Sequence, residues 1–210
     1  PFDEDSVDLI EEHRFSFIKI ASCSFTDWPL LERIVKTNSP VIASTAGASL
    51  EDIDKVFSFF DHRKKNIALM HCVAEYPTLN PNLQLNQIDL LRSRYPNTPI
   101  GYSTHEDPGN VDAVKIAVGK GVAILEKHVG VATEAFGLNA YSASPEQITA
   151  WLRSVQDAQA MAQPGVADGL VGSRVLVRPR HDRHGQPERI RQADRGPLPL
   201  PEVGRDHQHP

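Results

Sequence analysis

The sequence has few of the features that mark a disulfide-stabilised, zinc-knotted or membrane-embedded protein. Only two of its 210 residues are cysteines, Cys23 and Cys72, and they lack the paired spacing of a zinc knot or a redox motif. No apolar run approaches the roughly 20 residues that span a bilayer, and we find no charged-then-apolar leader, so we expect a cytoplasmic protein. Each cysteine lies in or beside an apolar segment, which predicts two buried thiols.

The charge balance excludes two further classes of partner. A formal net charge of -5 offers no attraction for nucleic acid or for an anionic membrane surface. The composition is 40% apolar, which is enough for one sizeable core. We therefore expect small-molecule partners, with no nucleic acid and no membrane.

The composition changes near residue 163. From Pro164 onward there is no Phe, Trp, Tyr, Lys, Cys or Met, while Arg, Pro, Gly and His crowd together. No apolar period survives there to offset the entropy of ordering the backbone. An Arg-rich tail can bind nucleic acid, but this one also carries acidic residues and offers no aromatic side chains for stacking. We predict a domain over 1–163 and a tail over 164–210 that is either disordered or the product of a shifted reading frame.

Strand-like and helix-like segments alternate along the first 163 residues. After a first helix over 4–12, we expect strands over 15–22, 40–45, 66–72, 99–104 and 123–129, which predicts a parallel sheet. Two of the intervening helices begin with a capping-box pattern, at Ser49 and at Ser144. Apolar residues at helical spacing predict packing against the sheet in three segments: Trp28-Leu31-Ile34-Val35, Val111-Val114-Val118 and Ile148-Trp151-Leu152-Val155.

Five βα units fit either an open sheet or part of an eight-stranded barrel. An open sheet gathers ligand contacts at one switch point, whereas a barrel gathers them from every strand. Here polar residues end all five strands: Lys19 and Ser22, Ser44 and Thr45, the segment 71–76, Ser103 and His105, and Glu126 and His128. We therefore predict an α/β fold of the (β/α)8 TIM-barrel type, present as a partial barrel of about five βα units.

Taken together, the segments 17–22, 40–45, 71–78, 101–105 and 125–128 resemble the sialic acid synthase (N-acetylneuraminate synthase) family, in which they occur in the same order. The resemblance implies that the five strands are strands 4 to 8 and that the first three are lacking. Members of this family condense phosphoenolpyruvate with an N-acylated amino sugar, such as N-acetylmannosamine, to a sialic-acid-type 2-keto acid and release phosphate. They use a divalent metal, commonly Mn2+ with Mg2+ or Co2+ as alternatives. The resemblance also implies a homodimer.

The resemblance assigns the metal to two histidines. His105 and His128 match the family's metal ligands, and a pair of neutral imidazoles leaves open positions for oxygen ligands. The alternative is that each is a core histidine that donates to a backbone carbonyl.

Lys19 matches the lysine that contacts phosphoenolpyruvate, and an ammonium at the end of an apolar strand requires an anionic partner. One alternative is an ion pair with a neighbouring carboxylate such as Glu126. Another is a Schiff base, as in a barrel aldolase or lyase. Glu126 shares a strand face with His128, so we expect it to move a proton or to orient the sugar.

The resemblance adds substrate contacts. Ser22, Ser44 and Ser103 match positions that bind phosphate or carboxylate oxygens, although a serine at a strand end is often only a turn residue. Tyr76 matches a substrate-side tyrosine, with packing against its own loop as the alternative.

Several features depart from the family pattern. Asn139 stands where many members have an aspartate that faces the sugar, and Ala74 stands where some have asparagine. The triplet Thr104-His105-Glu106 replaces the more usual Asp-His-Thr or Asp-His-Ser. These differences concern the sugar side, and a catalytically inactive barrel fragment remains an alternative.

Overall fold

The computed structural model describes residues 1–162 and contains one parallel sheet. Its strands, in the order β1-β2-β3-β4-β5, are Ile18–Ile20, Val41–Ser44, Ile67–His71, Ile100–Thr104 and Ile124–Lys127. All neighbouring pairs are parallel, which confirms the predicted alternation. The tail predicted over 164–210 lies outside the described residues.

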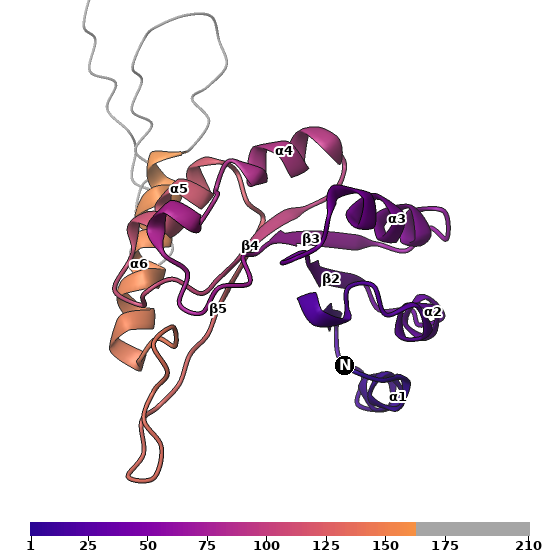
Figure 1. Cartoon of the computed structure of the whole chain (residues 1–210), viewed down its shortest axis with the longest axis horizontal. Coiled ribbons are helices and arrows are strands. Elements are labelled where there is room, and N and C mark those ends of the chain that lie inside the picture. The colour runs from indigo at the N-terminus through magenta and orange to yellow at the C-terminus, as the bar shows by residue number, and fades with distance from the viewer. Residues whose placement is uncertain (163–210) are drawn as a thin grey trace, which may run out of the picture. The chain divides into compact units, whose positions relative to one another are not determined.

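Helices connect the strands along one face of the sheet (Figure 1). They are α1 Glu4–Glu12, α2 Trp28–Val35, α3 Leu50–Asp61, α4 Gln87–Arg94, α5 Asp112–Gly119 and α6 Pro145–Met161, with short 3-10 helices η1 Ser22–Ser24 and η2 Asn80–Asn82. Among the helices of residues 1–162, none is long and apolar enough to cross a membrane.

The sheet is curled, as shown by a contact between side chains of its two edge strands on the face opposite the helices. Lys19 on β1 lies 3.2 Å from the Glu126 carboxylate on β5. In a flat sheet, strands four positions apart would be about 19 Å apart, farther than these two side chains can bridge. The curl and the parallel order identify the fold as a partial TIM barrel, as the sequence predicts.

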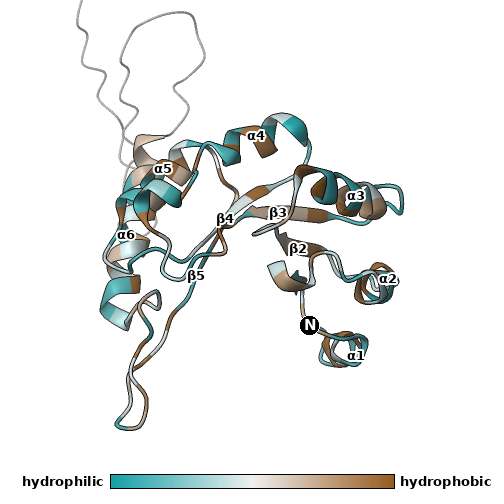
Figure 2. Ribbon diagram, in the orientation of Figure 1, coloured by the Kyte–Doolittle hydropathy of each residue, from teal (hydrophilic) through white to brown (hydrophobic). Residues whose placement is uncertain are grey.

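The core lies between the sheet and its helices (Figure 2). Alternate strand residues point toward the helices, so Ile18, Ile20, Leu69 and Tyr102 are almost fully buried. The residues between them, including Lys19, point to the concave face. This alternation leaves the concave face free to carry polar groups.

The structure confirms the helix starts that the sequence predicts from capping residues, whereas one strand differs in length. Both capping boxes form, at Ser49 with Asp52 and at Ser144 with Gln147, and they start α3 and α6 as predicted. The first predicted strand is shorter than expected, because the chain turns into η1 at Ser22.

Three predicted burial positions are wrong. Cys23 is exposed, because it lies in η1, where the chain has left the sheet. Trp28 and Leu152 belong to apolar stripes predicted to pack against the sheet, but they are 40% and 50% exposed because they lie at the margins of those stripes.

Candidate active site

Polar side chains from different strands meet on the concave face, near the carboxyl ends of the strands. Lys19 Nζ donates to Ser44 Oγ at 2.8 Å and lies 3.2 Å from Glu126. The Lys19 and Glu126 side chains are 28% and 42% exposed, so both remain accessible to a small molecule. The ion pair that the sequence left open as an alternative is therefore present.

Two histidines and two tyrosines form a second group beside the first. The ring centroids of His105 and His128 are 5.1 Å apart. Tyr76 lies 4.3 Å from His105, and Tyr141 lies 5.9 Å from His105 and 5.0 Å from His128. The rings make a continuous aromatic wall at the end of β4 and β5.

Sequence reasoning missed Tyr141. It lies in the loop between β5 and α6, which has no apolar period to mark it. A parallel bridge between Val129 and Ala143 fixes the path of that loop. Local sequence patterns do not predict this bridge, because it joins residues that are far apart in the sequence.

The contacts and the burial of His105 favour a neutral ring with its proton on Nδ1. Its Nδ1 lies 3.2 Å from the Val73 carbonyl oxygen, and because a carbonyl can only accept, Nδ1 carries the proton. Burial lowers the pKa of His105, which favours the neutral imidazole. Its Nε2 is then the nitrogen with a free lone pair.

The two histidines fit a divalent cation as a partial ligand set. In residues 1–162, no group of three or more His, Cys, Asp or Glu gathers in metal-binding geometry. His105 and His128 would thus supply two nitrogen ligands, and oxygen ligands from outside the protein would complete the shell.

Cys72 lies beside His105, Ser22 and Ser103. It is 8% exposed, as the sequence predicts, and its Sγ lies 3.8 Å from His105 Nδ1. Burial raises the pKa of this thiol, while the hydroxyls of Ser22 and Ser103 beside it act in the opposite direction. The thiol, the two serines and His105 therefore share one part of the concave face.

Two predicted substrate residues make local contacts. Ser22 Oγ accepts the Ala46 backbone N–H at 3.2 Å. Asn139 is exposed, and its side-chain oxygen accepts the Tyr141 backbone N–H at 3.2 Å. Asn139 thus supports the turn that carries Tyr141.

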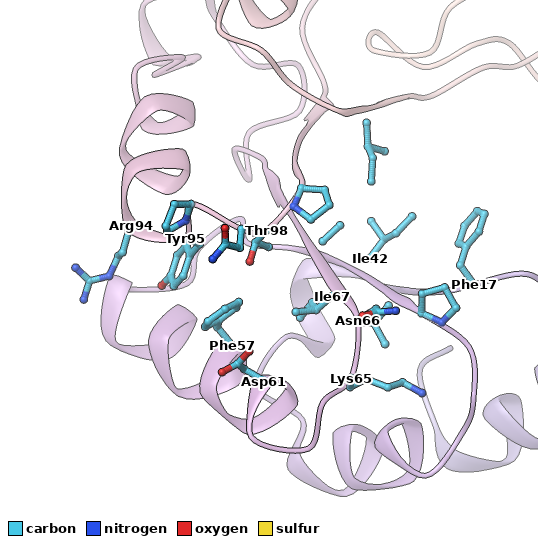
Figure 3. A pocket seen from close by; sticks show the side chains of 17 residues that line it. Phe17, Ile42, Phe57, Asp61, Lys65, Asn66, Ile67, Arg94, Tyr95 and Thr98 are labelled. Atoms are coloured by element: carbon cyan, nitrogen blue, oxygen red, sulfur yellow. The ribbon is translucent and has the colours of Figure 1, made fainter.

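A cavity of about 650 Å³ lies at the opposite, amino-terminal ends of the strands (Figure 3). Its lining includes Phe17, Ile42, Asn66 and Thr98, and it contains no residue predicted for the site. Because barrel enzymes carry their chemistry at the carboxyl ends, we assign the candidate site to the polar groups and not to this cavity.

Known proteins resemble this chain over most of its length. The NeuB family model matches residues 1–167. The spore coat polysaccharide biosynthesis protein SpsE of Bacillus subtilis (strain 168) is 31% identical over 177 residues, covering 81% of this chain and 47% of that protein.

Two crystal structures share the fold. One is described as spore coat polysaccharide biosynthesis protein E of Chromobacterium violaceum, with 56% identity, a TM-score of 0.78, and coverage of 81% of this chain and 51% of that one. The other is the N-acetylneuraminic acid (sialic acid) synthetase of Leptospira borgpetersenii in complex with citrate, with 30% identity, a TM-score of 0.74, and coverage of 81% and 59%. The chain spans about half the length of the curated relative it matches. With these matches and the site geometry together, the chain belongs to the NeuB family, the sialic acid synthase family that its strand-end segments resemble.

Proposed function

We propose that this chain supplies five strands of the active site of a synthase that condenses phosphoenolpyruvate with an N-acylated amino-sugar aldehyde. The product is a sialic-acid-type 2-keto sugar acid, and phosphate is released. The observation that carries the proposal is the placement of a lysine–hydroxyl group and a histidine pair on one concave face.

Phosphoenolpyruvate is a trianionic ligand at most, and the Lys19 group fits its charge. The Lys19 ammonium and the Ser44 hydroxyl lie 2.8 Å apart and offer donors to carboxylate or phosphate oxygens. Ser22 and Ser103 add hydroxyls nearby. An incoming anion competes with Glu126 for the ammonium, and this competition would leave the Glu126 carboxylate available to the reacting groups.

His105 and His128 are the residues that would hold the divalent cation, Mn2+ or else Mg2+ or Co2+. A cation bound there would polarise the sugar aldehyde as a Lewis acid. The His105 Nδ1–H bond to Val73 fixes the ring orientation, and Tyr76 and Tyr141 flank the histidine rings.

The bond-forming steps then follow in order. The methylene carbon of phosphoenolpyruvate forms a bond to the aldehyde carbon as the C=O π bond breaks, and the aldehyde oxygen takes up a proton from solvent. Water adds to the resulting cation at the second carbon, and in this proposal the Glu126 carboxylate accepts the proton of that water. Loss of phosphate from the tetrahedral carbon leaves the ketone.

The Schiff-base alternative at Lys19 has less support. Schiff-base formation requires a free amine, whereas the Lys19 nitrogen is engaged by the Glu126 carboxylate and the Ser44 hydroxyl.

Phosphate release tests the proposal. A full-length protein that contains this chain should release phosphate from phosphoenolpyruvate only when N-acetylmannosamine or a related acceptor and Mn2+ are present. His105→Ala and His128→Ala should each abolish that release. Activity retained in both single variants would overturn the metal role.

A further inference from the structure

A buried ion pair lies directly behind the histidine pair. The Glu106 carboxylate is 3.3 Å from Lys127 Nζ, and the two side chains are 0% and 1% exposed. Lys127 Nζ also donates to the Glu106 backbone oxygen at 3.1 Å. The proposed catalytic steps use neither residue.

The pair is placed where it can control the histidines. Glu106 directly follows His105, and Lys127 directly precedes His128. Strands β4 and β5 are hydrogen-bonded neighbours, and Thr104 is the register partner of Lys127. Because neighbouring residues on an extended chain point to opposite sides, the ion pair lies on the helix side while the two rings lie on the concave side.

Further contacts fix the carboxylate. Tyr102 donates its hydroxyl to the second Glu106 oxygen at 3.3 Å, and Thr104 donates to the Tyr102 hydroxyl at 2.9 Å. Both carboxylate oxygens are therefore engaged. A buried pair with its partners satisfied has little freedom to change its spacing, because separation would leave an unpaired charge.

We propose that Glu106 and Lys127 are a positioning pair that sets the spacing of His105 and His128. The proposal rests on the proposed metal role of the two histidines. It predicts that the pair acts on metal binding through the rings and not only on folding. Thr104 and Glu106 lie on the same side of the strand, and in this chain it is Glu106 that carries the carboxylate and reaches Lys127.

Three variants test whether the pair sets the spacing of the histidines: one moves the carboxylate, one removes both charges and one shortens the acidic side chain. Thr104 is the register partner of Lys127, so T104D/E106T moves the carboxylate from the residue after His105 to the residue before it and keeps the carboxylate opposite Lys127. E106M/K127M removes both charges at similar volume, a change that buried pairs often tolerate. E106D keeps the pair but shortens its link by one carbon.

The first readout is the affinity of the full 210-residue chain for Mn2+, measured by isothermal titration calorimetry with Mn2+ as the only ligand. H105A/H128A measures the Mn2+ that binds elsewhere, because four further histidines follow residue 162. We expect E106M/K127M and E106D to lose about 10-fold or more in affinity, as is usual when the partners of metal ligands are altered. T104D/E106T should remain close to the parent.

The second readout needs no metal. Imidazole proton–nitrogen NMR signals of His105 and His128 should shift in E106M/K127M and in E106D and should return in T104D/E106T. D54N, which removes an ion pair between α3 and α4, is the control for a general loss of stability and should not move them.

The outcomes separate the two proposals. If the parent binds no more Mn2+ than H105A/H128A while the ring signals still shift, the metal role fails and the positioning pair stands. The positioning proposal is overturned if E106D is folded and keeps both the parental Mn2+ affinity and the parental ring signals. This holds whether or not E106M/K127M folds.

Discussion

Glu106→Gln should destabilise the fold far more than the loss of a surface ion pair. The substitution keeps the side-chain volume but leaves the Lys127 ammonium buried, with its side chain 1% exposed. Removing one partner of a buried pair costs about 3–5 kcal/mol. For a domain of this size each kcal/mol lowers Tm by about 2–4 °C, so Tm should fall by about 6–20 °C.

Thermal unfolding followed by circular dichroism measures this loss. Lys55→Met is the matched control, because Lys55 pairs with Glu51 on the exposed surface of α3 and its loss should change Tm little. E106M/K127M should recover most of the stability, because neither charge is left alone. A Glu106→Gln protein that melts with the Lys55→Met protein would refute the reasoning.

Three further predictions follow from the burial of titratable groups and from the state of Lys19. Burial lowers the pKa of His105 and of His71 below their ordinary value of 6.5, so the unfolded chain binds more protons and the stability of the fold falls as pH drops through and below that value. His71→Gln should therefore flatten the dependence of Tm on pH between 7 and 5. An unchanged slope would contradict this prediction. A thiol reagent should label Cys23 alone in the native chain and both cysteines after unfolding, since Cys72 is 8% exposed; rapid native labelling of both would show that Cys72 is open. Borohydride with a keto acid should leave no adduct on Lys19, and a trapped adduct found by mass spectrometry would restore the Schiff-base alternative.

The sequence predicts the sheet well because its signals are local or periodic. Continuous apolar runs such as Ile67–His71 are typical of strands covered by helices, and the capping boxes at Ser49 and Ser144 depend only on residues within one turn. The concave placement of Lys19, Glu126 and the histidines follows from their position on strands that share one face.

The remaining features depend on contacts between distant residues. Tyr141 reaches the histidines only because the Val129–Ala143 bridge folds its loop back. The sequence places Lys127 on the helix side, but its partner Glu106 follows only from the register of β4 and β5. Cys23 is exposed because the chain turns into η1 at Ser22, where the apolar pattern predicts a continuing strand.

The central claim is that the concave face binds phosphoenolpyruvate through Lys19. The most direct test is calorimetric titration of the 210-residue chain with phosphoenolpyruvate, comparing the parent with Lys19→Met and with Lys55→Met as the control. We predict that the parent and Lys55→Met bind phosphoenolpyruvate and that Lys19→Met loses about 10-fold or more in affinity, because the ligand then lacks a charge-assisted hydrogen bond. Equal affinity in Lys19→Met and the parent would contradict it.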